Sequence, residues 1–129
     1  MNATSNQPPH TWATKFRHAF RGLGVGVTRQ NSFLVHVPVA AAVLVAATCF
    51  RVTQAEWCIL MLCITVVCSA EMFNSAMENM AKAVTREYRE ELRSSLDTAA
   101  AAVLVAALGS VVVGAIIFAP RLLPLLPAS

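Results

Sequence analysis

Long apolar runs alternate with short polar segments along this chain, and the pattern repeats three times. A helix that crosses a bilayer needs about 20 apolar residues, within a range of roughly 17–25, and the first and third runs reach that range. The second run is apolar for about fourteen residues and then changes character. The pattern predicts an all-α membrane protein with three transmembrane helices, over about residues 31–50, 55–84 and 96–119.

The second run continues into an amphipathic stretch, EMFNSAMENMAKAV, at positions 71–84. Apolar side chains recur there at helical spacing and define one face of a helix. Polar residues with the spacing i, i+3, i+4 and i+7 define another face: Glu71, Asn74, Ser75 and Glu78. The run and its continuation therefore predict one long helix, apolar all round at first and amphipathic at its later end.

The composition favours a membrane protein over a soluble one. Of the 129 residues, 57% are hydrophobic and 13% are charged, whereas a soluble domain carries roughly a quarter charged residues. A soluble chain of this size has much surface for its volume, so one small core could hardly bury such an apolar excess. The ten Lys and Arg residues are spread over short segments, and no nucleic-acid partner is expected. The four cysteines lie in or beside apolar runs, without a CxxC pair, and predict packing residues.

Basic residues are distributed unevenly around the three runs. Four precede the first run and four lie between the second and third, against one in the first connection and one after the third run. Loops rich in Lys and Arg stay in the cytoplasm. The N-terminus and the second connection are therefore predicted to be cytoplasmic, and the C-terminal tail to lie outside. The two basic groups are Lys15, Arg17, Arg21 and Arg29, and Lys82, Arg86, Arg89 and Arg93.

A short amphipathic segment precedes the first run, over about residues 13–28. Its apolar residues recur at i, i+3, i+4 and i+7, and they are Phe16, Ala19, Phe20 and Leu23. A basic amphipathic helix of this kind tends to lie in the membrane interface against anionic lipid; a cytoplasmic helix without membrane contact is the alternative. Residues 1–12 lack the basic and apolar regions of a signal peptide, and we expect them to form a disordered lead.

Two carboxylates, Glu71 and Glu78, lie on the polar face of the second predicted helix. Ionisable groups inside a span are energetically unfavourable and usually mark function. A pair of carboxylates with an amide and a hydroxyl between them suits Mg²⁺, which prefers oxygen ligands, or proton removal from a hydroxyl. Structural alternatives remain: Glu78 could pair with Lys82 at the surface, and Asn74 and Ser75 could hydrogen-bond between helices.

Asp97 is a third acid, placed where the third apolar run begins. An acid at that position either caps and stabilises the first turn of the helix or serves the site. The preceding segment, TREYREELRSSLD at positions 85–97, is expected to be mostly a solvated loop that could steer a charged nucleotide. The chain contains no P-loop, no Gly-rich phosphate cradle and no Ser/His/Asp arrangement.

These motifs resemble the small prokaryotic diacylglycerol kinase family, which also contains undecaprenol kinases. The segment EMFNSAME is similar to the family signature E-x-x-N-[ST]-x-x-E. The pieces AFRGL, NSF followed by VH, EYREEL and the D-x-A-A-x-A-V-L opening of the third run extend the likeness from about Phe16 to Pro120. The resemblance implies a homotrimer of three-span subunits with an N-terminal surface helix, in the bacterial inner membrane.

The resemblance also implies an activity and roles for individual residues. The family transfers the γ-phosphoryl group of ATP, with Mg²⁺, to a lipid hydroxyl at the cytoplasmic face; diacylglycerol is the expected substrate and undecaprenol the nearest alternative. Glu71 matches the general base, and Asn74 matches the amide at the site. Glu78 matches a ligand of the ATP-bound metal. The remaining nucleotide-side residues are Asp97, Arg93 and Arg17.

Gln30 and Leu96 depart from the family pattern. The family usually has a second metal-ligating Glu where this chain has Gln30, and a neutral amide oxygen should bind Mg²⁺ more weakly. Leu96 stands where Lys usually precedes the acid, so Arg93 or Lys82 would have to supply the positive charge. Phosphoryl transfer depends mostly on positioning and charge stabilisation. A non-catalytic membrane assembly that keeps the fold is therefore the alternative function.

Overall fold

The computed structural model describes residues 11–29, 33–85, 87 and 89–125. Four α-helices follow one another and a 3₁₀ turn ends the described chain: α1 (Trp12–Arg29), α2 (Phe33–Cys49), α3 (Gln54–Val84), α4 (Glu90–Leu122) and the turn Leu123–Leu125. No strand occurs in this described part, so the predicted all-α fold is confirmed. Gln30 and residues 1–10 lie outside it, and the predictions for them stay predictions.

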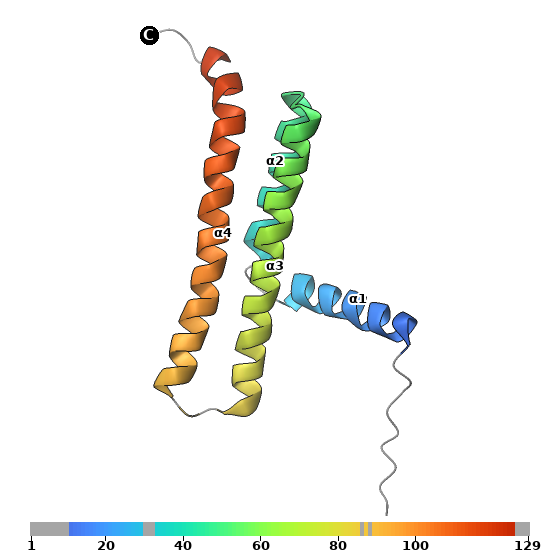
Figure 1. Ribbon diagram of the computed structural model, residues 1–129, viewed down its shortest axis with the longest axis vertical. Coiled ribbons are helices and arrows are strands. Elements are labelled where there is room, and N and C mark those ends of the chain that lie inside the picture. Colours follow the sequence, from blue (N-terminus) through green and yellow to red (C-terminus); the bar gives the residue numbers. More distant parts are fainter. Residues whose placement is uncertain (1–10, 30–32, 86, 88, 126–129) are drawn as a thin grey trace, which may run out of the picture.

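A hairpin of α3 and α4 forms the body of the fold (Figure 1). Helix α2 packs along α3, while α1 projects sideways and contacts α2 and α3. Across the described residues α1 makes no contact with α4. The turn between α2 and α3 lies at the same end as the C-terminus, and the α3–α4 connection lies at the opposite end. The amphipathic half of α3 therefore runs toward the α3–α4 connection.

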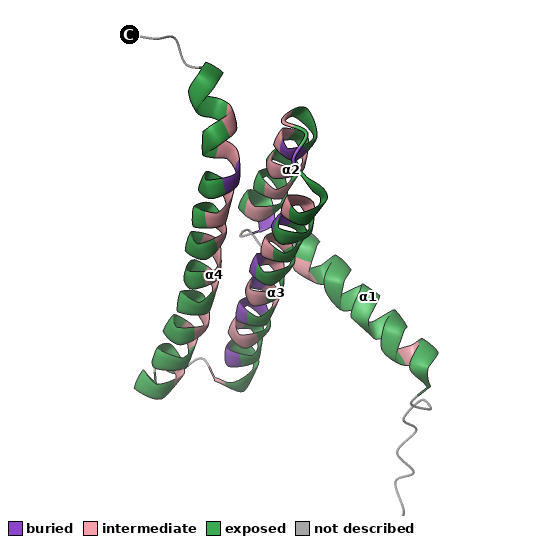
Figure 2. Cartoon of the chain, turned by 45° about the horizontal axis from the view of Figure 1, so that its top comes forward, coloured by how far each residue is buried: buried purple, intermediate pink, exposed green. Residues whose placement is uncertain are grey.

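The lengths and apolar character of the helices support a membrane protein. Helix α3, and α4 with the turn that follows it, are long and apolar enough to cross a membrane, whereas α2 is apolar but has only 17 residues. Many large apolar side chains of α4 are exposed, and Figure 2 colours most of this helix as exposed. Soluble monomers rarely expose a contiguous apolar surface of this extent. Lipid or a neighbouring subunit has to cover it.

Helix α3 begins at a capping box. The Thr53 hydroxyl accepts a hydrogen bond from the Glu56 backbone N–H at 3.3 Å, and the Glu56 carboxylate accepts one from the Thr53 N–H at 2.7 Å. The two residues thus satisfy donors that a helix start leaves unpaired. The Glu56 carboxylate also accepts hydrogen bonds from both terminal nitrogens of Arg121, at 3.0 and 2.8 Å. This pair ties the start of α3 to the end of α4.

A small apolar cluster lies at the same end of the bundle. Its buried members come from α2, the turn after it, α3 and α4: Ala47, Val52, Leu60 and Ile117. Phe50 and Phe118 pack beside it, with their ring centroids 6.1 Å apart. Arg51 takes a positive φ of 49° in the turn between α2 and α3, which permits a tight reversal. The cluster and the ion pair together fix the helix ends farthest from the α3–α4 connection.

The structure corrects the expectation of a solvated loop over positions 85–97. Helix α4 begins at Glu90 rather than near residue 96. Two acids in its first turn, Glu90 and Glu91, complement the helix dipole, and Arg93 lies 3.8 Å from Asp97 at the favourable i, i+4 spacing. Asp97 is therefore inside the helix. The prediction that it caps the first turn is wrong, since the N-cap position is Arg89.

The other helix bounds agree with the sequence prediction to within about two residues. Helix α1 starts at Trp12, which was assigned to the disordered lead. The Thr11 hydroxyl accepts a hydrogen bond from the Thr14 backbone N–H at 3.3 Å, so it caps the helix in the manner common for threonine. The predicted lead, residues 1–12, thus overlaps α1 by one residue.

Candidate active site

Three residues of the predicted polar face of α3 are buried, and Figure 2 marks buried positions along this helix in purple. Glu71, Asn74 and Ser75 are only 3%, 8% and 5% exposed. Large apolar side chains of the same stretch point outward, with Phe73 76% and Met80 55% exposed. Polar inside and apolar outside is the arrangement that an apolar solvent favours, because ionisable residues in a span face the protein interior or a cavity. The structure therefore gathers three of the sequence-predicted polar residues in one buried place.

Glu71 is the most deeply buried acid among the described residues. Its side chain is 4% exposed, and its Oε2 lies 3.9 Å from Nε2 of His36 on α2. Its Oε1 is buried and has no hydrogen-bond partner. A buried acceptor without a partner destabilises a fold, and unsatisfied groups of this kind call for an explanation such as a catalytic role. A hydrogen-bond donor that reached this buried oxygen would satisfy it.

His36 was not among the residues predicted from the sequence to form the site. Its contact with Glu71 joins residues 35 positions apart, which no helical spacing can reveal. A signal was present nonetheless, because His36 is an ionisable residue inside an apolar run, and such residues tend to mark function.

Glu78 lies one turn beyond Asn74 and is partly exposed. The Asn74 side-chain amide donates a hydrogen bond to Glu78 Oε1 at 3.3 Å, and Lys82 Nζ lies 3.8 Å from Oε2. The surface ion pair with Lys82, one of the alternatives left open by the sequence, is therefore present. Asn74 hydrogen-bonds within its own helix and so orients the Glu78 carboxylate.

Whether this site suits Mg²⁺ depends on the oxygen ligands that its side chains offer. The described residues hold no group of three or more His, Cys, Asp or Glu side chains that could bind a metal by themselves. Mg²⁺ usually binds one or two carboxylates together with substrate phosphates. A single accessible carboxylate such as Glu78 fits that pattern. Gln30, the other predicted metal ligand, lies outside the described residues.

The predicted nucleotide-side residues lie in two separate places. Arg93 and Asp97 line a shallow hollow of about 480 Å³ on α4, and both side chains are mostly exposed. Arg17 is exposed on α1, which does not contact α4 in the described chain. A single subunit therefore does not bring Arg17 and Asp97 together.

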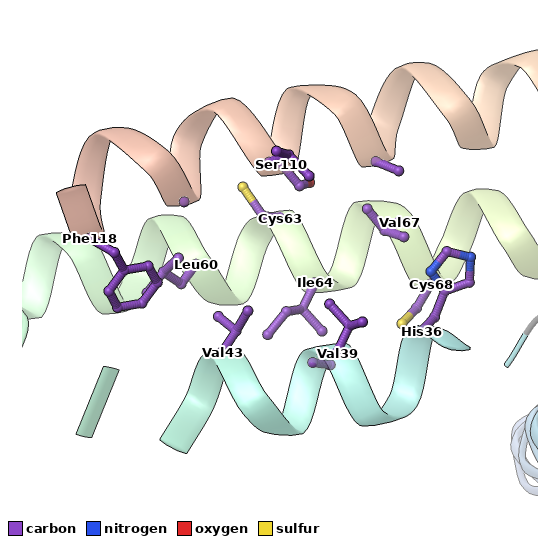
Figure 3. Close-up of a pocket in the computed structure, with 14 residues that line it drawn as sticks. His36, Val39, Val43, Leu60, Cys63, Ile64, Val67, Cys68, Ser110 and Phe118 are labelled. Atoms are coloured by element: carbon purple, nitrogen blue, oxygen red, sulfur yellow. The ribbon is translucent and has the colours of Figure 1, made fainter. Parts of the chain in front are cut away.

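The C-terminal end of α1 lies close to the part of α3 that carries Glu71. A side chain built on Gly26 would lie 3.8 Å from Met72, the residue after Glu71, and 4.0 Å from the buried Phe33. On the other side of His36, an apolar cavity of about 210 Å³ runs between α2, α3 and α4 (Figure 3). Glu71 thus lies where α1, α2 and α3 meet, with an apolar cavity nearby.

Comparison with known proteins identifies the family of this chain. The sequence pattern of prokaryotic diacylglycerol kinase matches residues 17–118. The chain belongs to the prokaryotic diacylglycerol kinase family. It is similar to an undecaprenol kinase from Bacillus subtilis (strain 168), with 33% identity over 83% of this chain and 87% of that protein. It is also similar to a diacylglycerol kinase from Synechocystis sp. (strain ATCC 27184 / PCC 6803 / Kazusa), with 32% identity over 86% of this chain and 64% of that protein.

Membership of the prokaryotic diacylglycerol kinase family confirms the resemblance inferred from the sequence. The chain is thereby a membrane-embedded lipid kinase, and the matched residues include the whole of α2 and α3. The two relatives are named for different lipids, so family membership identifies the class of reaction and leaves the individual lipid open.

Proposed function

We propose that this protein transfers the γ-phosphoryl group of ATP to the hydroxyl group of a membrane lipid, with diacylglycerol as the substrate and phosphatidic acid as the product. The observation that carries the proposal is the buried Glu71 carboxylate with its unpartnered Oε1. Undecaprenol is the alternative substrate, because one relative is named an undecaprenol kinase.

Glu71 is the general base of this proposal. Its Oε1 accepts the proton of the lipid hydroxyl, and the hydroxyl oxygen forms a bond to the γ-phosphorus as the bond from that phosphorus to the bridging oxygen breaks. ADP leaves with the electron pair of the broken bond, and the proton on Glu71 returns to water. Asn74 holds the neighbouring Glu78 carboxylate in place through its hydrogen bond of 3.3 Å.

The length of α3 supports different roles for the two carboxylates. An α-helix rises 1.5 Å per residue, and the hydrocarbon core is about 30 Å thick. If Glu56 at the start of α3 marks the outer boundary, Glu71 lies about 23 Å and Glu78 about 33 Å from it along the helix. Glu71 then lies just inside the hydrocarbon, where a lipid hydroxyl can reach it. Glu78 lies just beyond, where a nucleotide arrives from water.

Glu78 is the proposed ligand of Mg²⁺, with Gln30 as a second, neutral ligand. These two residues would hold Mg²⁺, which would supply positive charge against the negative charge that develops during transfer. Arg93, Asp97 and Arg17 are the proposed nucleotide contacts. In this proposal Arg93 supplies the positive charge that the family usually takes from the lysine at the position of Leu96.

A homotrimer is the proposed assembly. Arg17 on α1 and Asp97 on α4 lie on helices that do not touch within one chain, so a second copy is needed to bring both to one nucleotide. Helix α4 is rich in small residues, and a side chain added at Gly109 would meet open space. Small residues of this kind let membrane helices approach closely. The exposed apolar face of α4 supplies the surface for such packing.

The proposed topology has three spans, α2, α3 and α4, with α1 on the cytoplasmic surface of the bacterial inner membrane. Among the described residues, none covers the rings of Phe16 and Phe20 on the apolar face of α1, which are 61% and 71% exposed. Insertion of these rings at the interface would cover them. The N-terminus would lie in the cytoplasm and the C-terminus outside, as the basic residues predict.

The test is a purified protein assayed in lipid with γ-labelled ATP, Mg²⁺ and either diacylglycerol or undecaprenol. Label in phosphatidic acid supports the proposal, and label only in undecaprenyl phosphate replaces the substrate. No label in either lipid at saturating Mg²⁺ would favour the non-catalytic assembly, which Gln30 and Leu96 would then explain.

A further inference from the structure

His36 is the only basic side chain in α2, whose other residues are apolar or small apart from one threonine and the terminal cysteine. An ionisable residue in such a helix is unfavourable in lipid and usually faces a polar partner. The imidazole of His36 faces the Glu71 carboxylate, with Nε2 3.9 Å from Oε2. His36 on α2 therefore contacts Glu71 on α3, the proposed catalytic base. Each of these side chains would be unfavourable alone in a bilayer.

Asn74, three residues after Glu71 on α3, has a different partner. The Asn74 amide donates to Glu78 at 3.3 Å, and Lys82 also lies beside Glu78. The two carboxylate oxygens of Glu71 have different surroundings. Oε2 faces His36, whereas Oε1 is buried without a partner.

We propose that His36 is a positioning residue for the general base: its imidazole holds Oε2 of Glu71 and leaves Oε1 to take the proton of the lipid hydroxyl. This inference rests on the proposed lipid kinase function and deepens it. The contact is within ion-pair range, and a shift of about 1 Å brings the two atoms to hydrogen-bond distance.

The surroundings of His36 strengthen the interaction. The ring lies at the end of the apolar cavity of about 210 Å³, close to Cys68 one turn before Glu71 (Figure 3). Polar interactions are stronger in apolar surroundings than in water. A catalytic group has to be held within about 0.5 Å of its productive position, and misplacement by about 1 Å can reduce the rate about a hundredfold. Without its imidazole partner, Glu71 can rotate away from the lipid hydroxyl.

The first test compares His36→Leu with His36→Gln, and uses His18→Gln on the exposed surface of α1 as the matched control. His36→Leu removes the donor and should lower kcat at saturating lipid and MgATP by about ten- to a hundredfold. The KM for MgATP should stay unchanged. His36→Gln keeps an N–H donor of similar reach and should recover most of the rate, and His18→Gln should match the wild type. Elution of each variant as the wild-type oligomer in detergent shows that it has folded.

A double-variant cycle separates positioning of Glu71 from direct contact with the lipid. Glu71→Asp withdraws the carboxylate by one methylene and should lower kcat by itself. If His36 acts through Glu71, adding His36→Leu to Glu71→Asp should change kcat by less than about twofold, because coupled residues are not additive. A full multiplicative effect would overturn the proposal. So would a His36→Leu variant whose lipid KM rises while kcat stays constant, since His36 would then bind the lipid.

A third measurement does not depend on activity. Solid-state NMR of the protein in bilayers, with ¹⁵N-labelled histidine and ¹³C-labelled glutamate, should show a dipolar contact between the imidazole of His36 and the Glu71 carboxyl carbon. The contact should survive Glu78→Gln and disappear in Glu71→Ala. Its absence from an active wild-type enzyme would overturn the role of His36 alone. Its presence in a protein that phosphorylates no lipid would instead contradict the proposed function.

Discussion

Replacing Glu71 by glutamine removes one negative charge while leaving the shape of the side chain unchanged. A positioned general base contributes about 10²- to 10⁴-fold to a rate. The Glu71 side chain is only 4% exposed, so bulk water has little access to take its place as a base. We therefore expect a loss near the upper end, about 10³- to 10⁴-fold in kcat. This loss corresponds to about 4 to 5.5 kcal/mol of additional barrier.

The fold of Glu71→Gln should remain intact. A neutral amide is less unfavourable to bury than a carboxylate, and glutamine keeps an oxygen and adds a donor at the same place. The variant should insert in the membrane, elute as the wild-type oligomer and bind nucleotide as the wild type does. The assay is transfer of label from γ-labelled ATP to lipid under saturating conditions, measured beside a nucleotide-binding titration.

The matched control is Glu56→Gln, the same substitution at the start of the same helix. Glu56 binds Arg121 at the opposite end of α3 and lies 15 residues from Glu71, so its kcat should stay near the wild-type value. A Glu71→Gln variant that retains a rate within tenfold of the wild type would refute the role of Glu71 as the base. Equal losses in both variants would show a structural effect in place of a chemical one.

Three other predictions test the nucleotide side, the helix ends and the topology. Leu96→Lys should lower the KM for MgATP by about two- to fivefold, because an exposed ammonium attracts phosphate only modestly; steady-state kinetics measures this, and an unchanged KM would contradict it. Glu56→Gln and Arg121→Gln should each lower the thermal unfolding midpoint in detergent, with no further loss in the double variant, because both break the same pair; additive losses would argue against the coupling. With the native cysteines replaced, Leu125→Cys should react with an impermeant maleimide from outside the cell and Glu87→Cys only from the cytoplasm. The reverse labelling would overturn the orientation.

Local pattern explains most of what the sequence predicted correctly. The starts and ends of α1, α2 and α3 follow from runs of apolar residues and from helical periodicity, both of which are properties of neighbouring residues. The start of α4 was missed because residues 90–97 are mostly charged or polar, with only Leu92 and Leu96 apolar. That stretch is helical because its acids complement the helix dipole and because Arg93 and Asp97 pair along one face.

The candidate site was predictable only in part. The common face of Glu71, Asn74 and Ser75 follows from their spacing on a single helix, and the structure confirms that these three residues are buried together. The contact of Glu71 with His36 depends on how α2 packs against α3, which the sequence of neither helix contains. The separation of Arg17 from Asp97 likewise depends on the direction in which α1 leaves the bundle.

The most direct test of the account is an experimental structure of the protein in a bilayer with Mg²⁺, a non-hydrolysable ATP analogue and diacylglycerol. The account predicts the lipid hydroxyl at hydrogen-bond distance from Oε1 of Glu71, with the γ-phosphate beside it on a Mg²⁺ ion bound by Glu78. A structure in which a side chain of a neighbouring subunit hydrogen-bonds to Oε1 of Glu71, with the γ-phosphate bound elsewhere, would contradict the account.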